Sequence, residues 1–105
     1  MQRKSSAEKN LSPRIVCAAP FRLVKVSPLA DYKLDVEFID GTRGIVEMKY
    51  YIMSEHAGVF ASLRDIKLFN NVYLQYGVAS WPGEIDLAPD AMYDEITRHG
   101  KWVLK

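Results

Sequence analysis

The sequence predicts an α+β fold: an antiparallel sheet of about four to five strands in hairpins, short helices between the hairpins, and a C-terminal helix. Three observations support this prediction. Apolar and polar residues alternate over 32–38, a second alternating segment covers 72–81, and a helical pattern over 89–99 ends at Gly100. The 105 residues are the length of one domain.

The N-terminal residues differ in charge from the rest of the chain. Residues 1–25 contain six basic residues and one acidic residue, whereas residues 26–105 contain eight basic and twelve acidic residues. Residues 1–14 also lack periodicity, so we expect a flexible basic arm there, followed by a single domain over 15–105. The arm has no interleaved aromatic residues and few cations for phosphate binding. A solvated tail is therefore favoured over an arm that touches nucleic acid or an acidic partner.

The first strand is expected to begin near Phe21 and to end at Ser27-Pro28. The clearest strand follows over 32–38, with one buried and one wet face. Asp40-Gly41 is a preferred hairpin pair, which makes 42–48 the returning strand. A two-residue loop would turn Val46 to the face opposite Phe38. Either that face is also partly covered or the loop is longer, and the pattern leaves both alternatives open.

Residues 49–65 are expected to be helical in pieces, because Gly58 interrupts their helical spacing. Leu68 and Phe69 then lie in a connector and are expected to be buried. The second hairpin covers 72–81, where Gly77 suits a turn or a bulge, and Pro82-Gly83 ends it.

The final helix is expected to begin at Pro89, which suits the first helical position. Ala88 before it is a poor cap, and acidic residues in the early turns suit the helix dipole. Gly100 is a natural stop, and 101–105 are expected to form a final packing segment.

The sequence predicts no catalytic, cofactor-binding or metal-binding residues. His56 and His99 lie 43 positions apart, and with Cys17 they do not make a set of zinc ligands. Cys17 lies in the apolar stretch IVCAAP, which would raise the pKa of its thiol, so it is interpreted as a small buried residue. Glycine-rich phosphate loops are absent. We expect a protein without enzymatic activity or cofactor.

Five residues are candidate partner contacts: Trp81, Glu84, Asp86, Asp90 and Tyr93. The carboxylates of this segment could form an acidic patch for a basic partner. They could equally be solvated groups that complement a helix N-terminus, and this second interpretation is favoured. Trp81 is either a core lid, the favoured interpretation, or an exposed anchor. Twelve aromatic residues exceed what the core needs, so one aromatic face is expected to be a contact surface.

The sequence contains no apolar run that approaches the roughly 20 residues that a membrane span needs. The stretch 15–20 is too short for a signal peptide. A single cysteine also favours a reducing compartment, so we expect a cytoplasmic protein with no membrane partner.

Three ordered segments resemble the small bacterial domain-of-unknown-function family 2442. They read VKVSPLADYKLDVEFIDGTRGIVEM, GVFASLRDIKLFNNVYL and ASWPGEIDLAPDAMYDEI, within residues 22–96. The shared features are the PL-x-DY-x-L-x-V-x-F-x-DG hairpin, the F-x-x-L-x-D-x-x-LF middle, and the W-P-x-x-IDL-x-P-D-x-(M/L)Y end. Ala88 departs from the small hydroxyl residue expected there.

The resemblance implies a compact α+β domain with an antiparallel sheet and no established activity. Some relatives carry a helix-turn-helix extension, for which too few residues follow here, so direct DNA binding is not expected. Members often occur beside a small toxin-like companion, which implies an antitoxin-like role.

The first functional hypothesis is therefore a non-enzymatic protein-interaction module, the antitoxin-like half of a two-protein system. Its partner would be a small protein, basic if the acidic body binds it. An edge strand or the aromatic face would also suit a homodimer. The alternative is a small-ligand or metabolite-binding domain, with a pocket between the sheet and the final helix.

Overall fold

The computed structural model describes residues 21–105 of the chain. The predicted arm over 1–14, the start of the predicted domain at 15, and Cys17 lie outside the described residues. No helix in 21–105 is long and apolar enough to cross a membrane.

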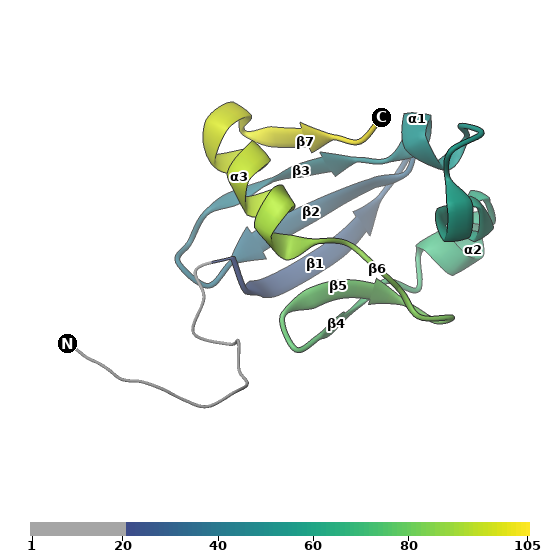
Figure 1. Ribbon diagram of the computed structural model, residues 1–105. Coiled ribbons are helices and arrows are strands. Elements are labelled where there is room, and N and C mark those ends of the chain that lie inside the picture. The colour runs from purple at the N-terminus through teal and green to yellow at the C-terminus, as the bar shows by residue number, and fades with distance from the viewer. Residues whose placement is uncertain (1–20) are drawn as a thin grey trace.

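Seven strands and four short helical segments follow one another along the described chain (Figure 1). The α+β class is confirmed, and residues 49–65 are helical in pieces, as expected. The elements are β1 (Leu23–Leu29), β2 (Lys33–Phe38), β3 (Arg43–Glu47), α1 (Lys49–Ile52), the 3-10 helix η1 (Gly58–Arg64), α2 (Ile66–Phe69), β4 (Tyr73–Gln75), β5 (Val78–Trp81), β6 (Ile85–Asp86), α3 (Pro89–His99) and β7 (Lys101–Val103).

The strands form two sheets. The larger has the order β1-β2-β3-β7, and the smaller has the order β4-β5-β6. The first three strands of the larger sheet are antiparallel neighbours, but β7 pairs with β3 in parallel. The larger sheet is therefore mixed, and the C-terminal segment expected only to pack adds a strand to it. A parallel neighbour needs a long crossover, which here contains the whole smaller sheet and α3.

The loop between β2 and β3 is longer than two residues. Glu37 pairs with Arg43 and Leu34 with Val46, so Val46 lies on the same face as Leu34. The N–H of Phe38 donates to the carbonyl of Thr42 at 2.8 Å, and Gly41 has a φ of +91°. A positive φ next to a bulge is the usual way to close a three-residue hairpin loop. The longer-loop alternative is thus the correct one.

The predicted end of the first strand at Ser27-Pro28 is wrong, since β1 runs on to Leu29. Proline removes a donor, and a central strand would lose a ladder hydrogen bond at that position. β1 is an edge strand of the larger sheet, where an absent N–H costs little.

The second hairpin is confirmed as β4 and β5. Gln75 pairs with Val78, so Tyr76 and Gly77 alone form the turn, and both have positive φ. Two residues of positive φ give the turn whose twist matches paired strands. Beyond Trp81 the chain turns at Pro82-Gly83 and returns as β6.

The final helix begins and ends where the sequence predicts. Pro89 occupies the first turn of α3, and Gly100 closes it with a φ of +79°. α3 packs closely on β3 at Gly44. A Cβ on Gly44 would lie 2.6 Å from Cγ2 of Ile96 and 2.7 Å from the carbonyl oxygen of Gly100. Only a residue without a side chain fits there.

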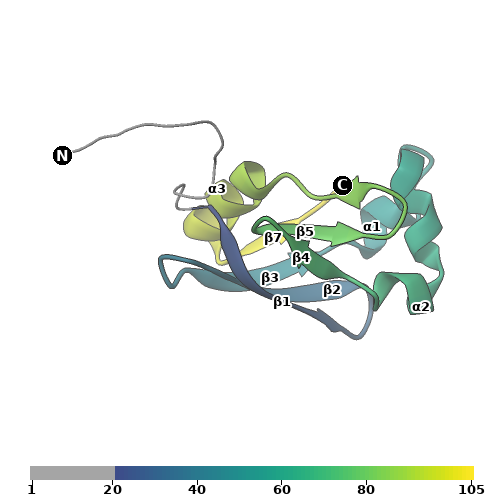
Figure 2. The same cartoon turned by 90° about the horizontal axis from the view of Figure 1, so that it is seen from below.

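The smaller sheet and α3 lie on the same side of the larger sheet (Figure 2). The core fills the space between these layers. Its largest fully buried side chains are Trp81, Phe38, Phe69, Leu23, Leu34, Met48, Ile52, Leu63, Met92, Val36 and Val46. The opposite, outer face of the larger sheet carries ion pairs between neighbouring strands. These are Lys25–Asp35, Arg43–Glu37 and Lys101–Glu47.

Candidate interaction site

A surface groove of about 690 Å³ lies where the carboxyl ends of β3 and β7 meet α1. We call it the α1 groove. The carboxyl end of the chain lies beside α1 in both ribbon views (Figures 1 and 2). The groove is lined by Asp31, Lys33, Glu47, Lys49, Tyr50, Met53, Ser54, Glu55, His56, Val103 and Lys105. None of these residues belongs to α3, so the groove is not the expected pocket between the sheet and the final helix.

The α1 groove combines charge with exposed apolar surface. Lys49 Nζ lies 3.0 Å from Oδ1 of Asp31, and both side chains are more than half exposed. Tyr50 is 71% exposed and Met53 is 47% exposed, because the single turn of α1 buries only Ile52. Large exposed apolar side chains beside a groove are typical of contact surfaces.

A second groove, of about 510 Å³, lies on the other side of the C-terminal segment. We call it the aromatic groove. The rings of Tyr51 and Phe60 meet edge to face there, with centroids 5.6 Å apart. Its lining residues are Tyr51, Phe60, Asp86, Leu87, Ala88, Trp102, Val103, Leu104 and Lys105.

β7 lies between the two grooves and is an edge strand of the larger sheet. No described strand pairs with the side of β7 turned away from β3, which we call the β7 edge. The N–H of Leu104 donates to the carbonyl of Glu47 at 3.0 Å, towards β3. Because hydrogen-bonding groups alternate in direction along a strand, the N–H groups of Lys101 and Val103 point to the β7 edge.

Arg64 holds the α1 region in place. Its Nε donates to the carbonyl of Ile52 at 2.8 Å, and its Nη2 donates to the carbonyl of Ser54 at 3.1 Å. A helix leaves its last carbonyl groups without partners, and the guanidinium fork supplies donors there. Arg64 was not predicted from the sequence, since no local pattern shows which carbonyl a long side chain will reach.

Of the five predicted partner contacts, Trp81 lies in the core. Its side chain is 0% exposed, and its indole Nε1 donates to the carbonyl of Phe69 at 2.8 Å. The rings of Phe60 and Phe69 pack against it. Trp81 therefore offers no surface to a partner. Its prediction as a partner contact is wrong, and the core interpretation is favoured.

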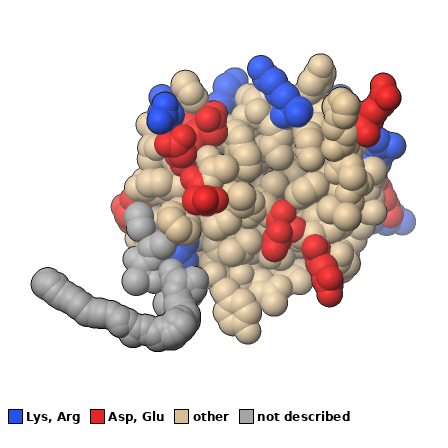
Figure 3. Space-filling view, viewed as in Figure 1, with Lys and Arg blue, Asp and Glu red and all other residues tan. Residues whose placement is uncertain are grey.

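Glu84, Asp86 and Asp90 are all exposed, but they belong to different elements. Glu84 lies in the turn before β6 with a φ of +63°, Asp86 lies on β6, and Asp90 lies in the first turn of α3. Acidic side chains on this side of the molecule form separate groups with neutral surface between them (Figure 3). Only Asp86 among the five residues lines a groove described above.

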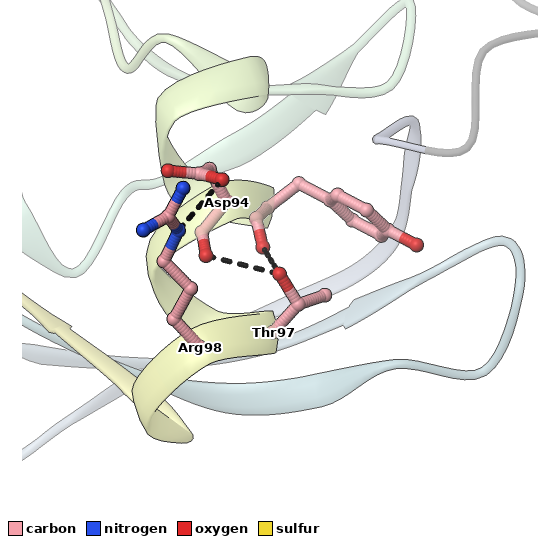
Figure 4. Close-up of polar contacts among 4 residues, drawn as sticks. Asp94, Thr97 and Arg98 are labelled. Atoms are coloured by element: carbon pink, nitrogen blue, oxygen red, sulfur yellow. Dashed lines mark hydrogen bonds and ion pairs between the residues drawn. The ribbon is translucent and has the colours of Figure 1, made fainter.

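Carboxylates on α3 are engaged with the helix itself (Figure 4). Asp94 Oδ1 accepts from Nε of Arg98 at 3.1 Å, one turn later, and Asp90 Oδ1 accepts from the N–H of Ala91. Thr97 Oγ1 lies 2.9 Å from the carbonyl oxygen of Asp94. These contacts favour the interpretation that the acidic residues support the helix.

Tyr93 is half-buried and links α3 to the β2–β3 loop. Its hydroxyl donates to Oδ2 of Asp40. This bond, with the Thr42 N–H that donates to Oδ1 at 2.9 Å, holds the pKa of Asp40 below its ordinary value. The same bond raises the pKa of the Tyr93 hydroxyl. Across 21–105, no three His, Cys, Asp or Glu residues gather as metal ligands.

The chain belongs to the family described as protein of unknown function (DUF2442), whose model matches residues 23–98. The resemblance carried by the three sequence motifs is thereby confirmed. The matched span runs from β1 into α3 and ends before β7. Comparison with curated proteins and with solved structures finds no match.

Proposed function

We propose that this member of the family is a non-enzymatic protein-interaction module that binds an extended segment of a partner along the β7 edge. The observation that supports the proposal is the position of this unpaired edge between two grooves. An extended segment that adds a strand to a sheet gains main-chain hydrogen bonds, and flanking pockets select its side chains.

The two grooves lie where such a segment would direct its side chains. Successive side chains of a strand point to opposite faces of its sheet. Val103 pairs with Glu47, and both line the α1 groove. Trp102 and Leu104 line the aromatic groove alone, whereas Val103 and Lys105 border both grooves. The side chains of an added strand would therefore alternate between one groove and the other.

A variant of β7 tests this function in the full chain. Val103→Pro removes an N–H that points to the β7 edge and leaves the hydrogen bond between Leu104 and Glu47 in place. Val103→Thr is the matched control, because it keeps that N–H and a β-branched side chain. Circular dichroism and thermal unfolding establish that both variants fold.

The measurement is an affinity pull-down from lysate of the source cells with the wild-type chain and both variants as baits. We expect a stoichiometric small protein to bind the wild type and Val103→Thr, and to be lost with folded Val103→Pro. A partner that Val103→Pro retains equally well, or no partner at all, would contradict the proposal.

The family resemblance implies an antitoxin-like form of this function, in which the partner is a toxin-like companion. Production of that partner alone should then slow growth, and co-production with the wild-type chain should restore it. Co-production with Val103→Pro should fail to restore growth. Growth that is unaffected by the partner would leave an interaction module without the neutralising role.

A second candidate function is small-ligand binding in the α1 groove, whose volume lies in the range of roughly 300–1,000 Å³ usual for ligand sites. A ligand at 100 times its dissociation constant should raise the free energy of unfolding by about 2.7 kcal/mol. A thermal-shift screen would detect it, and Tyr50→Ala should abolish the shift, while Tyr73→Ala on β4 is the control. A screen without hits would remove this candidate.

A further inference from the structure

The side chains along β7 form two rows. Ile45 of β3 pairs with Lys101, and Glu47 pairs with Val103, so these side chains share the outer face of the larger sheet. Lys105 lies two residues further and lines the α1 groove together with Val103. The outer row beside the β7 edge therefore reads lysine, valine, lysine.

The inner row is apolar. Trp102 pairs with Val46, which is fully buried, and Leu104 follows two residues later. Both side chains are half-buried and pack against the core while they line the aromatic groove. A segment added at the β7 edge would meet these apolar side chains on this face, with Asp86 also in the lining of the aromatic groove.

Lysine side chains stand at both ends of the outer row, and one of them is paired with a carboxylate of β3. Lys101 Nζ lies 3.6 Å from Oε2 of Glu47, and its side chain is more than half exposed. Lys105 makes no ion pair with a carboxylate of the described residues. Side chains directly opposite each other on neighbouring strands are close enough that opposite charges attract and like charges repel.

This row disfavours a second copy of the chain as the occupant. Two β7 strands that pair antiparallel about Val103 would place each Lys101 opposite the Lys105 of the other copy. The two lysines would repel each other, and symmetry would place this repulsion at both ends of the strand pair. Charge complementarity thus points to a different chain with acidic residues at these two positions.

We propose that the partner segment is an extended strand with a carboxylate, an apolar residue and a second carboxylate at alternate positions, and apolar residues between them. The carboxylates would face Lys101 and Lys105, the central apolar residue would face Val103, and the intervening residues would enter the aromatic groove. This inference rests on the proposed function, because it names the chemistry of the segment that the β7 edge binds.

The test is selection of displayed random twelve-residue peptides against the full chain. We expect enriched sequences with Asp or Glu two residues either side of an apolar residue. A synthetic peptide of the enriched sequence should bind the double variant Lys101→Glu/Lys105→Glu at least about tenfold more weakly than it binds the wild type. A second peptide, with lysines in place of the carboxylates, should bind the double variant as tightly as the first peptide binds the wild type. A tenfold change corresponds to about 1.4 kcal/mol. Lys67→Glu, an exposed lysine on α2, is the control and should bind as the wild type does.

Other outcomes overturn the inference in distinguishable ways. Enriched basic or neutral peptides whose binding is lost in Val103→Pro would contradict the acidic partner and keep the interaction module. Peptides that bind Val103→Pro unchanged, or a selection without enrichment, would contradict both. A homodimer that dissociates in Val103→Pro, seen by light scattering, would replace the acidic partner by a second copy.

Discussion

The indole Nε1 of Trp81 donates a hydrogen bond of 2.8 Å to the main-chain carbonyl oxygen of Phe69. The bond joins the end of β5 to the end of α2, a four-residue helix of which Phe69 is the last residue. Both side chains are fully buried. The side chain that the sequence offered as an anchor for a partner is thus the one that joins the smaller sheet to the helical segment.

Trp81→Phe should lower the free energy of unfolding by about 1–3 kcal/mol, because the buried carbonyl of Phe69 loses the indole donor and keeps only the longer bond from the N–H of Val72, at 3.3 Å. Urea unfolding followed by far-ultraviolet circular dichroism would measure the change. Tyr76→Phe is the control, since Tyr76 is 81% exposed and its substitution should change stability by less than about 0.5 kcal/mol. Equal stability of Trp81→Phe and wild type would show that the hydrogen bond contributes nothing.

The contact between Tyr93 and Asp40 predicts a dependence of stability on pH. The pKa of Asp40 is lowered in the folded chain from its ordinary 3.8, chiefly by the Tyr93 hydroxyl. A carboxyl with a depressed pKa stabilises the fold above its unfolded pKa, and this stabilisation is lost as pH falls through the folded pKa. The pKa of Tyr93 is raised from its ordinary 10.0, chiefly by Asp40, so its contribution is present below pH 10 and is lost as pH rises through the folded value.

Tyr93→Phe tests this prediction, because it removes the hydroxyl and leaves the ring. The difference in urea midpoint between wild type and Tyr93→Phe should be largest near neutral pH. It should shrink as pH falls below about 4 and as pH rises above about 10. A difference that is constant across this range would show that Asp40 and Tyr93 titrate independently in the folded chain.

Gly44→Ala should destabilise the fold by about 1–3 kcal/mol through overpacking between β3 and α3. The added Cβ would meet a carbonyl oxygen as well as Ile96, and backbone cannot rotate away as a side chain can. Thermal unfolding would measure the loss. A melting temperature equal to that of the wild type would mean that α3 shifts on the sheet without cost.

Ala88→Ser should stabilise the chain by about 0.5–2 kcal/mol. Ala88 is the N-cap of α3, has extended backbone angles, and supplies no side-chain hydrogen bond to the helix. A serine hydroxyl there can accept from an N–H of the first turn. Ala91→Ser, inside the same turn, is the matched control and should give no gain. Equal unfolding free energies for both serine variants would contradict the capping argument.

The sequence by itself determined the local elements whose signals lie within a few residues. The alternation within β2, a turn at Gly77, and the Pro89 and Gly100 limits of α3 all follow from side-chain direction or backbone angles. Such preferences depend on neighbours in the chain, so they can be read without knowing the fold. The three family motifs are likewise continuous segments that can be found in the sequence without knowledge of the fold.

The tertiary structure alone decided which segments meet. Residues 101–103 are too few to predict a strand from their sequence. They form β7 because α3 returns the chain beside β3. The candidate site arises from this pairing, since Tyr50 is far in sequence from Val103 and Lys105 and meets them only around β7. The burial of Trp81 depends in the same way on Phe60 and Phe69 from a distant segment. Contacts between distant segments depend on packing of the whole chain, which local patterns do not encode.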